Sequence, residues 1–200
     1  MNLGMMRRRE SQTSSMYDAE IEYIEKRNDT STKSAPILSL DINPDERYDC
    51  FEITFQCTGS VVEQDRFVNS SNACSEFYAN VQRKYSTLIN KAAKQFYGAA
   101  IDRNKHIVKI DYKNGKCYLD GVERLSFTGG YSNVQGVGIA LLRTINYCKI
   151  FNFKFWHNET QVCDLNSVRK GNVGYMYDSI NEVLHDLDNT INTYVFGADK

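Results

Sequence analysis

Side chains that could catalyse a reaction are scarce and scattered in this sequence. Each of the three histidines lies without a neighbouring nucleophile or a second metal ligand: His106, His157 and His185. A catalytic triad would need folding to bring one of them to a serine or cysteine and an acid. The acidic pairs Glu20/Glu22 and Asp41/Asp45 do not form the row of facing carboxylates that a glycosidase uses. The sequence therefore predicts that the protein is not an enzyme and has no catalytic residue.

The cysteines are not spaced like the ligands of a structural zinc site, because no Cys-x-x-Cys pair occurs. The six are Cys50, Cys57, Cys74, Cys117, Cys148 and Cys163. Residues 1–6 are too few for the apolar core of a signal peptide, and no run approaches the roughly 18 apolar residues of a membrane span. We expect free, buried thiols in a protein folded in a reducing cytoplasm, with no metal, no cofactor and no membrane insertion.

The glycines Gly171 and Gly174 resemble part of a phosphate-binding loop in their spacing. No Lys-Ser or Lys-Thr follows them and no helix start is indicated, so a phosphate loop is not predicted. Residues 163–178 instead predict a strand that ends at Cys163, a turn over residues 164–167 and a closing strand over residues 173–178. The two glycines then mark places where a positive φ or a close backbone approach is needed.

The composition is that of one globular domain rich in β-structure. A chain of 200 residues can bury one core, and 13 tyrosines with 10 phenylalanines favour strands. The net charge of −1 provides no basic footprint for nucleic acid.

Short alternations of apolar and polar residues, separated by turn residues, recur along the chain. Strands are predicted over residues 20–24 (at a sheet edge), 37–42, 48–57, 96–100, 106–112, 116–120, 124–128, 136–142 and 147–156. In the clearest of them Phe51, Ile53 and Phe55 should point into the core. Residues 61–75 are predicted as a loop, Asn114-Gly115 as a two-residue hairpin turn and Asp120-Gly121 as a second turn.

Residues 75–96 fit two secondary structures. Apolar residues at spacings of three and four favour a helix, whereas the short runs around Phe77 and Tyr85 also fit strands joined by turns. The local pattern favours the helix, and consistency with the rest of the chain favours strands. Because short strands recur so regularly, the whole chain predicts an all-β, antiparallel sandwich.

The most aromatic stretch of the chain follows residue 150. On a strand, Phe151, Phe153 and Phe155 would share one face, with Ile150 and Trp156 on the other. One face belongs to the core. The other is either buried as well, which is the favoured alternative, or available to a second chain, a sugar or a peptide. The candidate ligand or partner patch is therefore Phe151, Phe153, Phe155 and Trp156.

The first 19 residues predict a flexible tail ahead of a folded domain over residues 20–200. The tail contains a basic, methionine-rich segment made of Met5, Met6, Arg7, Arg8 and Arg9. Free in solution, such a segment is expected to be disordered. Arginine and methionine would also suit docking onto an acidic partner surface.

Four sequence features together resemble the small concanavalin A-like or laminin G-like lectin-type jelly rolls of tailed bacteriophages and prophages of gut bacteria. They are the Met/Arg-rich start, an opening strand over residues 21–25, a strand with an N-G-K-x-Y-x-D-G hairpin over residues 106–121, and closing segments between residues 148 and 197. The resemblance covers roughly residues 20–200. The chain departs from the family over residues 27–38, which lack a first-strand extension, and at Asn166-Ser167, where a proline is usual.

The resemblance implies a concanavalin A-like jelly roll with a non-enzymatic role in a virion, as a capsid decoration, head-fibre or tail-associated protein assembled in the host cytoplasm. The N-terminal segment would anchor the protein to the particle, and the lectin-like module would face outward. The expected partners are other virion proteins, host-surface glycans and further copies of this chain. A free carbohydrate-binding module is the alternative, and a glycosidase is a weaker one.

Overall fold

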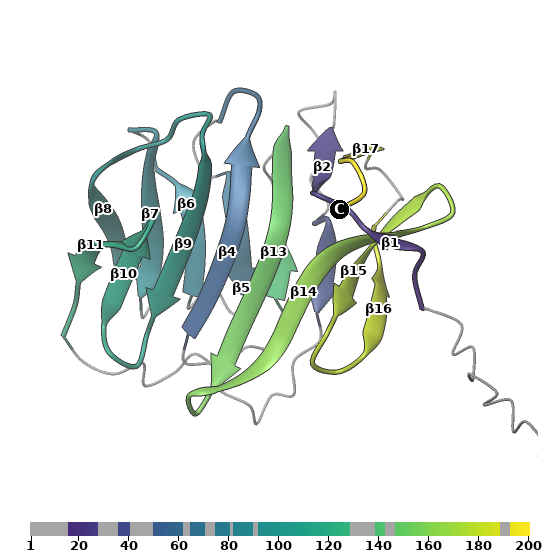
Figure 1. Cartoon of the computed structure of the whole chain (residues 1–200). Helices are drawn as coiled ribbons and strands as arrows, with labels where there is room; N and C mark the ends of the chain where they lie inside the picture. The colour runs from purple at the N-terminus through teal and green to yellow at the C-terminus, as the bar shows by residue number, and fades with distance from the viewer. Residues whose placement is uncertain are drawn as a thin grey trace, which may run out of the picture.

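The computed structural model describes residues 16–27, 36–40, 50–61, 65–70, 75–80, 82–89, 92–128, 139–142, 147–188 and 193–200. Within these ranges the chain forms antiparallel strands and no helix, and therefore no helix that could cross a membrane. The strands make two sheets, one in front of the other (Figure 1). The predicted all-β, antiparallel fold class is confirmed, and the chain forms a two-layered sandwich.

The larger sheet is built from eleven strands. They are β1 (Ala19–Glu20), β2 (Ile24–Arg27), β4 (Cys50–Cys57), β9 (Lys105–Asp111), β10 (Lys116–Leu119), β11 (Val122–Ser126), β13 (Cys148–His157), β14 (Thr160–Lys170), β15 (Val173–Asp178), β16 (Val183–Asp186) and β17 (Thr193–Phe196). The main order is β11-β10-β9-β4-β13-β14-β15-β16. The single edge strand predicted over residues 20–24 is not present as such. It is divided between β1, which pairs with β14, and β2, which begins at Ile24 and pairs with β13 and β17 on its two sides.

The smaller sheet has six strands in the order β3-β12-β5-β6-β7-β8. They are β3 (Leu38–Leu40), β5 (Arg66–Ser70), β6 (Ser75–Ala79), β7 (Lys84–Ile89), β8 (Ala92–Ala100) and β12 (Ile139–Leu141). The predicted loop over residues 61–75 thus contains β5, whose Phe67 and Val68 are buried. Burial of these two side chains stabilises the strand. The polar residues on either side of them had indicated a loop instead.

The core lies between the two sheets and is dominated by aromatic rings. Phe51, Ile53 and Phe55 are fully buried along one face of β4, as their alternation predicted. The ring of Phe55 lies 4.6 Å from that of Phe67 in the smaller sheet, measured between centroids. The ring centroids of Phe77 and Tyr85 each lie 5.8 Å from that of Phe55. These contacts join the two layers.

Residues 75–96 form strands β6, β7 and the start of β8, which decides between the two predicted structures. Phe77, Tyr85 and Phe96 belong to the run of apolar residues at spacings of three and four that favours a helix, yet all three are fully buried and lie on separate strands. Sheet pairing to β5 and burial against Phe55 are long-range interactions, and they override the local helical pattern.

β14 runs without interruption through residues 164–167, so the turn predicted there is wrong. Asp164 and Asn166 favour turns in isolated sequence, but here their side chains accept hydrogen bonds from Nδ2 of Asn152 on the neighbouring strand, at 2.8 and 3.0 Å. The chain turns at Gly171 instead, with a φ of 60°. Gly174 is required for a different reason, because a Cβ there would overlap the ring of Phe196.

The hairpin motif of residues 106–121 is present and the turn predicted at Asp120-Gly121 is confirmed, but the two-residue turn predicted at Asn114-Gly115 is wrong. β9 and β10 are joined by the four residues after Asp111, whose carboxylate accepts from the backbone N–H of Asn114 at 2.9 Å. The two-residue turn is Asp120-Gly121, between β10 and β11, with φ values of 51° and 78°. Two positive φ angles match the right-handed twist of adjacent strands.

The N-terminal residues that the structure describes are attached to the larger sheet. β1 pairs with β14, and the ring of Tyr17 lies 4.9 Å from that of Tyr177. The carboxylate of Asp18 accepts from the backbone N–H of Gly171 at 2.6 Å. The predicted anchor residues Met5, Met6, Arg7, Arg8 and Arg9 lie outside the described residues.

Candidate functional site

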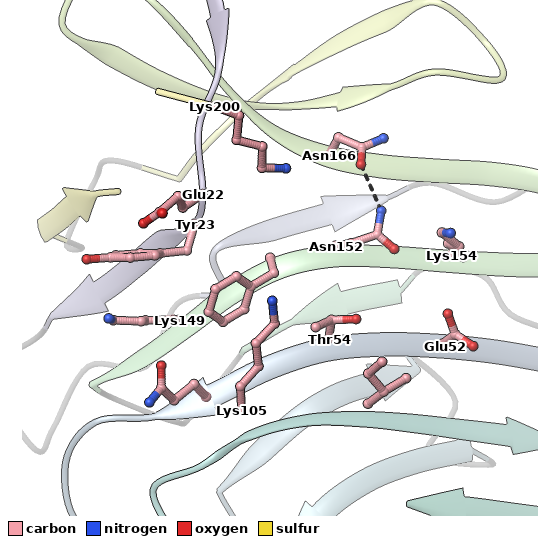
Figure 2. Close-up of a pocket in the computed structure, with 13 residues that line it drawn as sticks. Glu22, Tyr23, Glu52, Thr54, Lys105, Lys149, Asn152, Lys154, Asn166 and Lys200 are labelled. Carbon is pink, nitrogen blue, oxygen red and sulfur yellow. Dashed lines mark hydrogen bonds between the residues drawn. The ribbon is translucent and has the colours of Figure 1, made fainter. Parts of the chain in front are cut away.

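An open groove with a volume of about 790 Å³ lies on the outer face of the larger sheet. Its floor consists of the outward side chains of β4, β9 and β13, and it is called here the outer-face groove. Figure 2 shows Glu22, Tyr23 and Lys149 at one end of it and Glu52 and Lys154 at the other. Lys200, near the end of the chain, also lines it, so segments far apart in the sequence build one surface.

Strand register arranges the outward side chains of this face in rows. One row is Lys105–Gln56–Lys149, the next is Ile107–Thr54–Asn152–Asn166, and a third is Lys109–Glu52–Lys154–Asp164. Neighbours in a row stand on adjacent strands, roughly 4.8 Å apart. The groove is therefore a regular array of amines, amides, hydroxyls and carboxylates.

A β-bulge in β13 brings one aromatic ring into this array. Ile150 pairs with Phe55 and Asn152 pairs with Thr54, so Phe151 has no residue opposite it on β4. Both Phe151 and Asn152 lie on the outer face, because an extra residue shifts the alternation of the strand by one.

The predicted sharing of one face by the three phenylalanines is wrong for this reason. Phe153 and Phe155 are buried in the core, whereas Phe151 is half-buried in the groove. Trp156 is also half-buried, with Nζ of Lys109 5.3 Å from its ring. Only two members of the predicted patch, Phe151 and Trp156, therefore reach the outer face.

Two lysines and two aromatic rings form a chain of contacts across one end of the groove. Nζ of Lys105 lies 4.0 Å from the centre of the Phe151 ring. That ring meets the ring of Tyr23 edge-on, with centroids 5.7 Å apart. Nζ of Lys149 then lies 3.9 Å from the centre of the Tyr23 ring. These cation–π contacts hold both ammonium groups in place.

Sequence reasoning missed Tyr23, Lys105 and Lys149 as site residues. Alternation marks Lys105 and Lys149 as outward-facing, because the flanking residues His106, Cys148 and Ile150 are buried. No local pattern shows that these two lysines contact a pair of neighbouring aromatic rings, since that depends on how β9, β4, β13 and β2 pair.

In the middle of the groove, the side-chain amide of Asn152 is fixed by hydrogen bonds to β14. Nδ2 of Asn152 donates toward Oδ1 of Asp164, the carbonyl of Leu165 and Oδ1 of Asn166, at 2.8, 2.9 and 3.0 Å; the last of these is drawn in Figure 2. The orientation of this amide is set by these acceptors. Its Oδ1 therefore faces away from β14 and is available to accept from a ligand.

The described groove includes neither histidine nor cysteine. The cysteines that the structure describes are free and buried, as predicted: Cys50, Cys57, Cys117, Cys148 and Cys163. Burial raises the pKa of Cys117 and Cys163, so these thiols stay protonated and unreactive at neutral pH. Cys74 lies outside the described residues. The side chains that the groove offers to a ligand are therefore hydrogen-bonding groups and aromatic rings.

His106 is held by two carboxylates at one end of β9. Its Nδ1 lies 2.7 Å from Oδ2 of Asp120, and its Nε2 lies 2.8 Å from Oδ1 of Asp102. Burial lowers the pKa of His106, but the hydrogen bonds to Asp120 and Asp102 outweigh burial and raise that pKa above its ordinary value. Because both ring nitrogens are occupied, His106 joins two turns and is not available as a catalytic base.

Raising the pH from about 6 to about 8 should weaken the fold through His106. The unfolded imidazole has a pKa of about 6.5, and the folded pKa is higher. The stabilisation is therefore complete below the unfolded pKa and is lost as the pH rises through the folded pKa. In urea denaturation, His106→Gln should reduce this pH dependence and should cost about 1–3 kcal/mol at the acidic end. Equal pH slopes for the two proteins would contradict this role.

Comparisons with known proteins do not place the chain in a family. No model of a protein family matches it, and no curated protein is significantly similar to it in sequence.

Proposed function

We propose that the protein is a non-enzymatic carbohydrate-binding module with a concanavalin A-like jelly-roll fold, and that it binds its ligand in the outer-face groove. The observation that carries this proposal is the pair of half-buried rings, Phe151 and Tyr23, in an open groove lined by amides, amines and carboxylates. A sugar has an apolar face of C–H groups that packs on an aromatic ring, and hydroxyl groups that bond to such polar side chains. The two antiparallel sheets support the jelly-roll part of the proposal.

The shape of the outer face favours an extended ligand. A second hollow of about 410 Å³ adjoins the groove over β9 and β10 and shares Glu52 and Ile107 with it. Lys109, Asp111 and Tyr118 line this second hollow. Together the two hollows cross the outer face over several strands, so an oligosaccharide suits it better than a single sugar unit.

The virion role implied by the sequence resemblance stays a prediction. Its anchor, Met5 to Arg9, lies outside the described residues. An outward-facing module that binds host-surface glycans would agree with the proposed groove. The glycosidase alternative would need two facing carboxylates, for which Glu22 and Glu52 are the groove's acidic residues.

Replacing Phe151 with alanine should weaken binding of the best ligand on a glycan array by about tenfold, because an aromatic stacking contact contributes about 1–1.5 kcal/mol. Tyr175→Ala is the matched control, since Tyr175 is a half-buried ring on β15 that does not line the groove. It should bind like the wild type, and the melting temperature of both variants should show that they are folded.

Two outcomes would contradict the proposal. If no glycan on the array binds, or if Phe151→Ala binds as tightly as the wild type, the groove is not a carbohydrate site. Prolonged incubation with the bound glycan should release no reducing ends. Release of reducing ends that Glu52→Gln abolishes would establish the glycosidase alternative instead.

A further inference from the structure

The lysines of the outer-face groove differ in what compensates their charge. Lys154 pairs with Asp164 at 3.9 Å, and Lys200 pairs with Glu20 at 3.7 Å. Lys105 and Lys149, in contrast, make no ion pair with any carboxylate of the described residues. Their contacts are with the rings of Phe151 and Tyr23. A ring orients an ammonium group but does not neutralise it.

The two ammonium groups each lie against one ring of the aromatic pair, Lys105 against Phe151 and Lys149 against Tyr23. Lys105 and Lys149 both stand opposite Gln56, one on each side of β4, so their backbones are roughly 10 Å apart across two strand spacings. Gln56 between them is uncharged, and its Nε2 donates to the carbonyl of Arg103 at 2.9 Å. A ligand lying on Phe151 and Tyr23 would therefore meet a positive charge on either side.

The charge of the whole groove has the same sign. Four lysines line it against two glutamates, and Glu52 stands in the row that contains Lys109 and Lys154. Glu22 is exposed beside Tyr23. The end of the groove at Lys105 and Lys149 is thus complementary to an anion, and its middle, near Thr54 and Asn152, to neutral hydroxyl groups.

We propose that the ligand is an acidic saccharide, whose carboxylate or sulfate group binds Lys105 and Lys149 and draws their ammonium groups off the ring faces, while an apolar sugar face packs on Phe151 and Tyr23. This inference rests on the proposed carbohydrate-binding function and adds the chemical class of the ligand. An anion gains charge-assisted hydrogen bonds from both lysines, and a neutral sugar gains only ordinary ones. The proposal therefore predicts a preference between glycans that differ in one acidic group.

The test uses the full chain on a set of matched glycan pairs. Each pair contains a uronic- or sialic-acid glycan with its carboxyl-reduced form, or a sulfated glycan with its desulfated form. The acidic member should bind at least about tenfold more tightly, and its binding should weaken as salt is added. Preference within the carboxylate pairs or within the sulfate pairs distinguishes the two sources of negative charge.

Variants assign the preference to the two lysines. Lys105→Gln and Lys149→Gln should each weaken binding of the acidic glycan by about tenfold and leave the neutral partner unchanged. Lys105→Arg should keep the preference. Lys170→Gln removes an exposed lysine outside the groove and should have no effect. Lys105 is exposed as well, so melting temperatures should stay close to that of the wild type.

Failure of this inference and failure of the proposed function give different results. If both members of every pair bind equally while Phe151→Ala still reduces binding, the groove binds carbohydrate but the acidic ligand is wrong. If the glutamine variants keep the preference, the acidic group does not bind at Lys105 and Lys149. If no glycan binds at all, the proposed function itself is wrong.

Discussion

Replacing Lys26 with methionine should lower the free energy of unfolding near neutral pH by about 3–5 kcal/mol. Lys26 is fully buried, and burial lowers its pKa to about 8, so the ammonium is still mostly charged at neutral pH. Its Nζ donates to the carbonyl of Leu142 at 2.9 Å, and the carboxylates of Asp65 and Asp188 act on its charge. Methionine fills a similar volume but removes the donor and leaves Asp65, which is also buried, without this cation.

This lysine joins the two layers of the sandwich. Lys26 lies on β2 of the larger sheet, whereas Leu142 follows β12 and Asp65 precedes β5, both in the smaller sheet. The double variant Lys26→Met/Asp65→Asn should therefore recover part of the lost stability in urea denaturation, because it removes the remaining buried charge together with its partner. A single variant as stable as the wild type would contradict this account.

The pH dependence of the same pair of proteins provides a second readout. The folded pKa of Lys26, about 8, lies below its unfolded value of about 10.4. Between these values the unfolded state binds more protons at Lys26, so this residue makes the wild type more stable as the pH rises. The stability difference between the wild type and Lys26→Met should therefore widen from about pH 8 to about pH 10.

Replacing Phe55 with alanine should cost about 3–5 kcal/mol of stability, the range for large-to-small changes of a buried aromatic residue. Phe55 is fully buried on β4, and its ring contacts those of Phe67, Phe77 and Tyr85 in the opposite sheet. Alanine would leave a cavity at the point where the two sheets meet. The measurement is urea or thermal denaturation monitored by circular dichroism.

The preceding residue on the same strand, Thr54, provides the matched control. Thr54 faces the opposite side of β4, in the outer-face groove, and is half-buried. Thr54→Ala should therefore change stability by less than about 1 kcal/mol. Phe55→Leu should fall between the two variants because it keeps part of the contact. Equal losses at residues 54 and 55 would mean that this strand does not separate a core face from an outer face.

The inward-facing residues of β4 and β13 also hold the groove in shape. The outward side chains of β4 and β13 are positioned by inward side chains of the same strands, such as Phe55 and Phe153, which are locked in the core. The packed core therefore holds the polar groups of the groove in position before a ligand binds, so the site is preorganised.

Some of the fold follows from local chemistry. A strand points successive side chains to opposite faces, so the alternation in residues 50–57 alone places Phe51, Ile53 and Phe55 in the core. The closing strand over residues 173–178 and the need for glycine at Gly171, for a positive φ, and at Gly174, for a close approach, also follow from residue type. Free, buried cysteines follow from their spacing and number, for the five that the structure describes.

Other features depend on residues that are distant in the sequence. Residues 75–96 form strands because β5 and Phe55 are available to pair and pack with them. Asp164 and Asn166 sit in a strand because Asn152 lies beside them. The bulge at Phe151 is defined by pairing with β4, and a shift of one residue is enough to move the following phenylalanines from the outer face to the core.

By itself, therefore, the sequence determined the all-β class, the inward face of its clearest strand and the turn at Asp120-Gly121, because these depend on the conformational preferences of a few adjacent residues. Only the tertiary structure decided the register. Register gathers Tyr23, Lys105 and Lys149 around Phe151 from three separate segments, and it buries the ammonium of Lys26 between two sheets. A candidate ligand site built across paired strands is a property of their pairing, which no local stretch of this sequence contains.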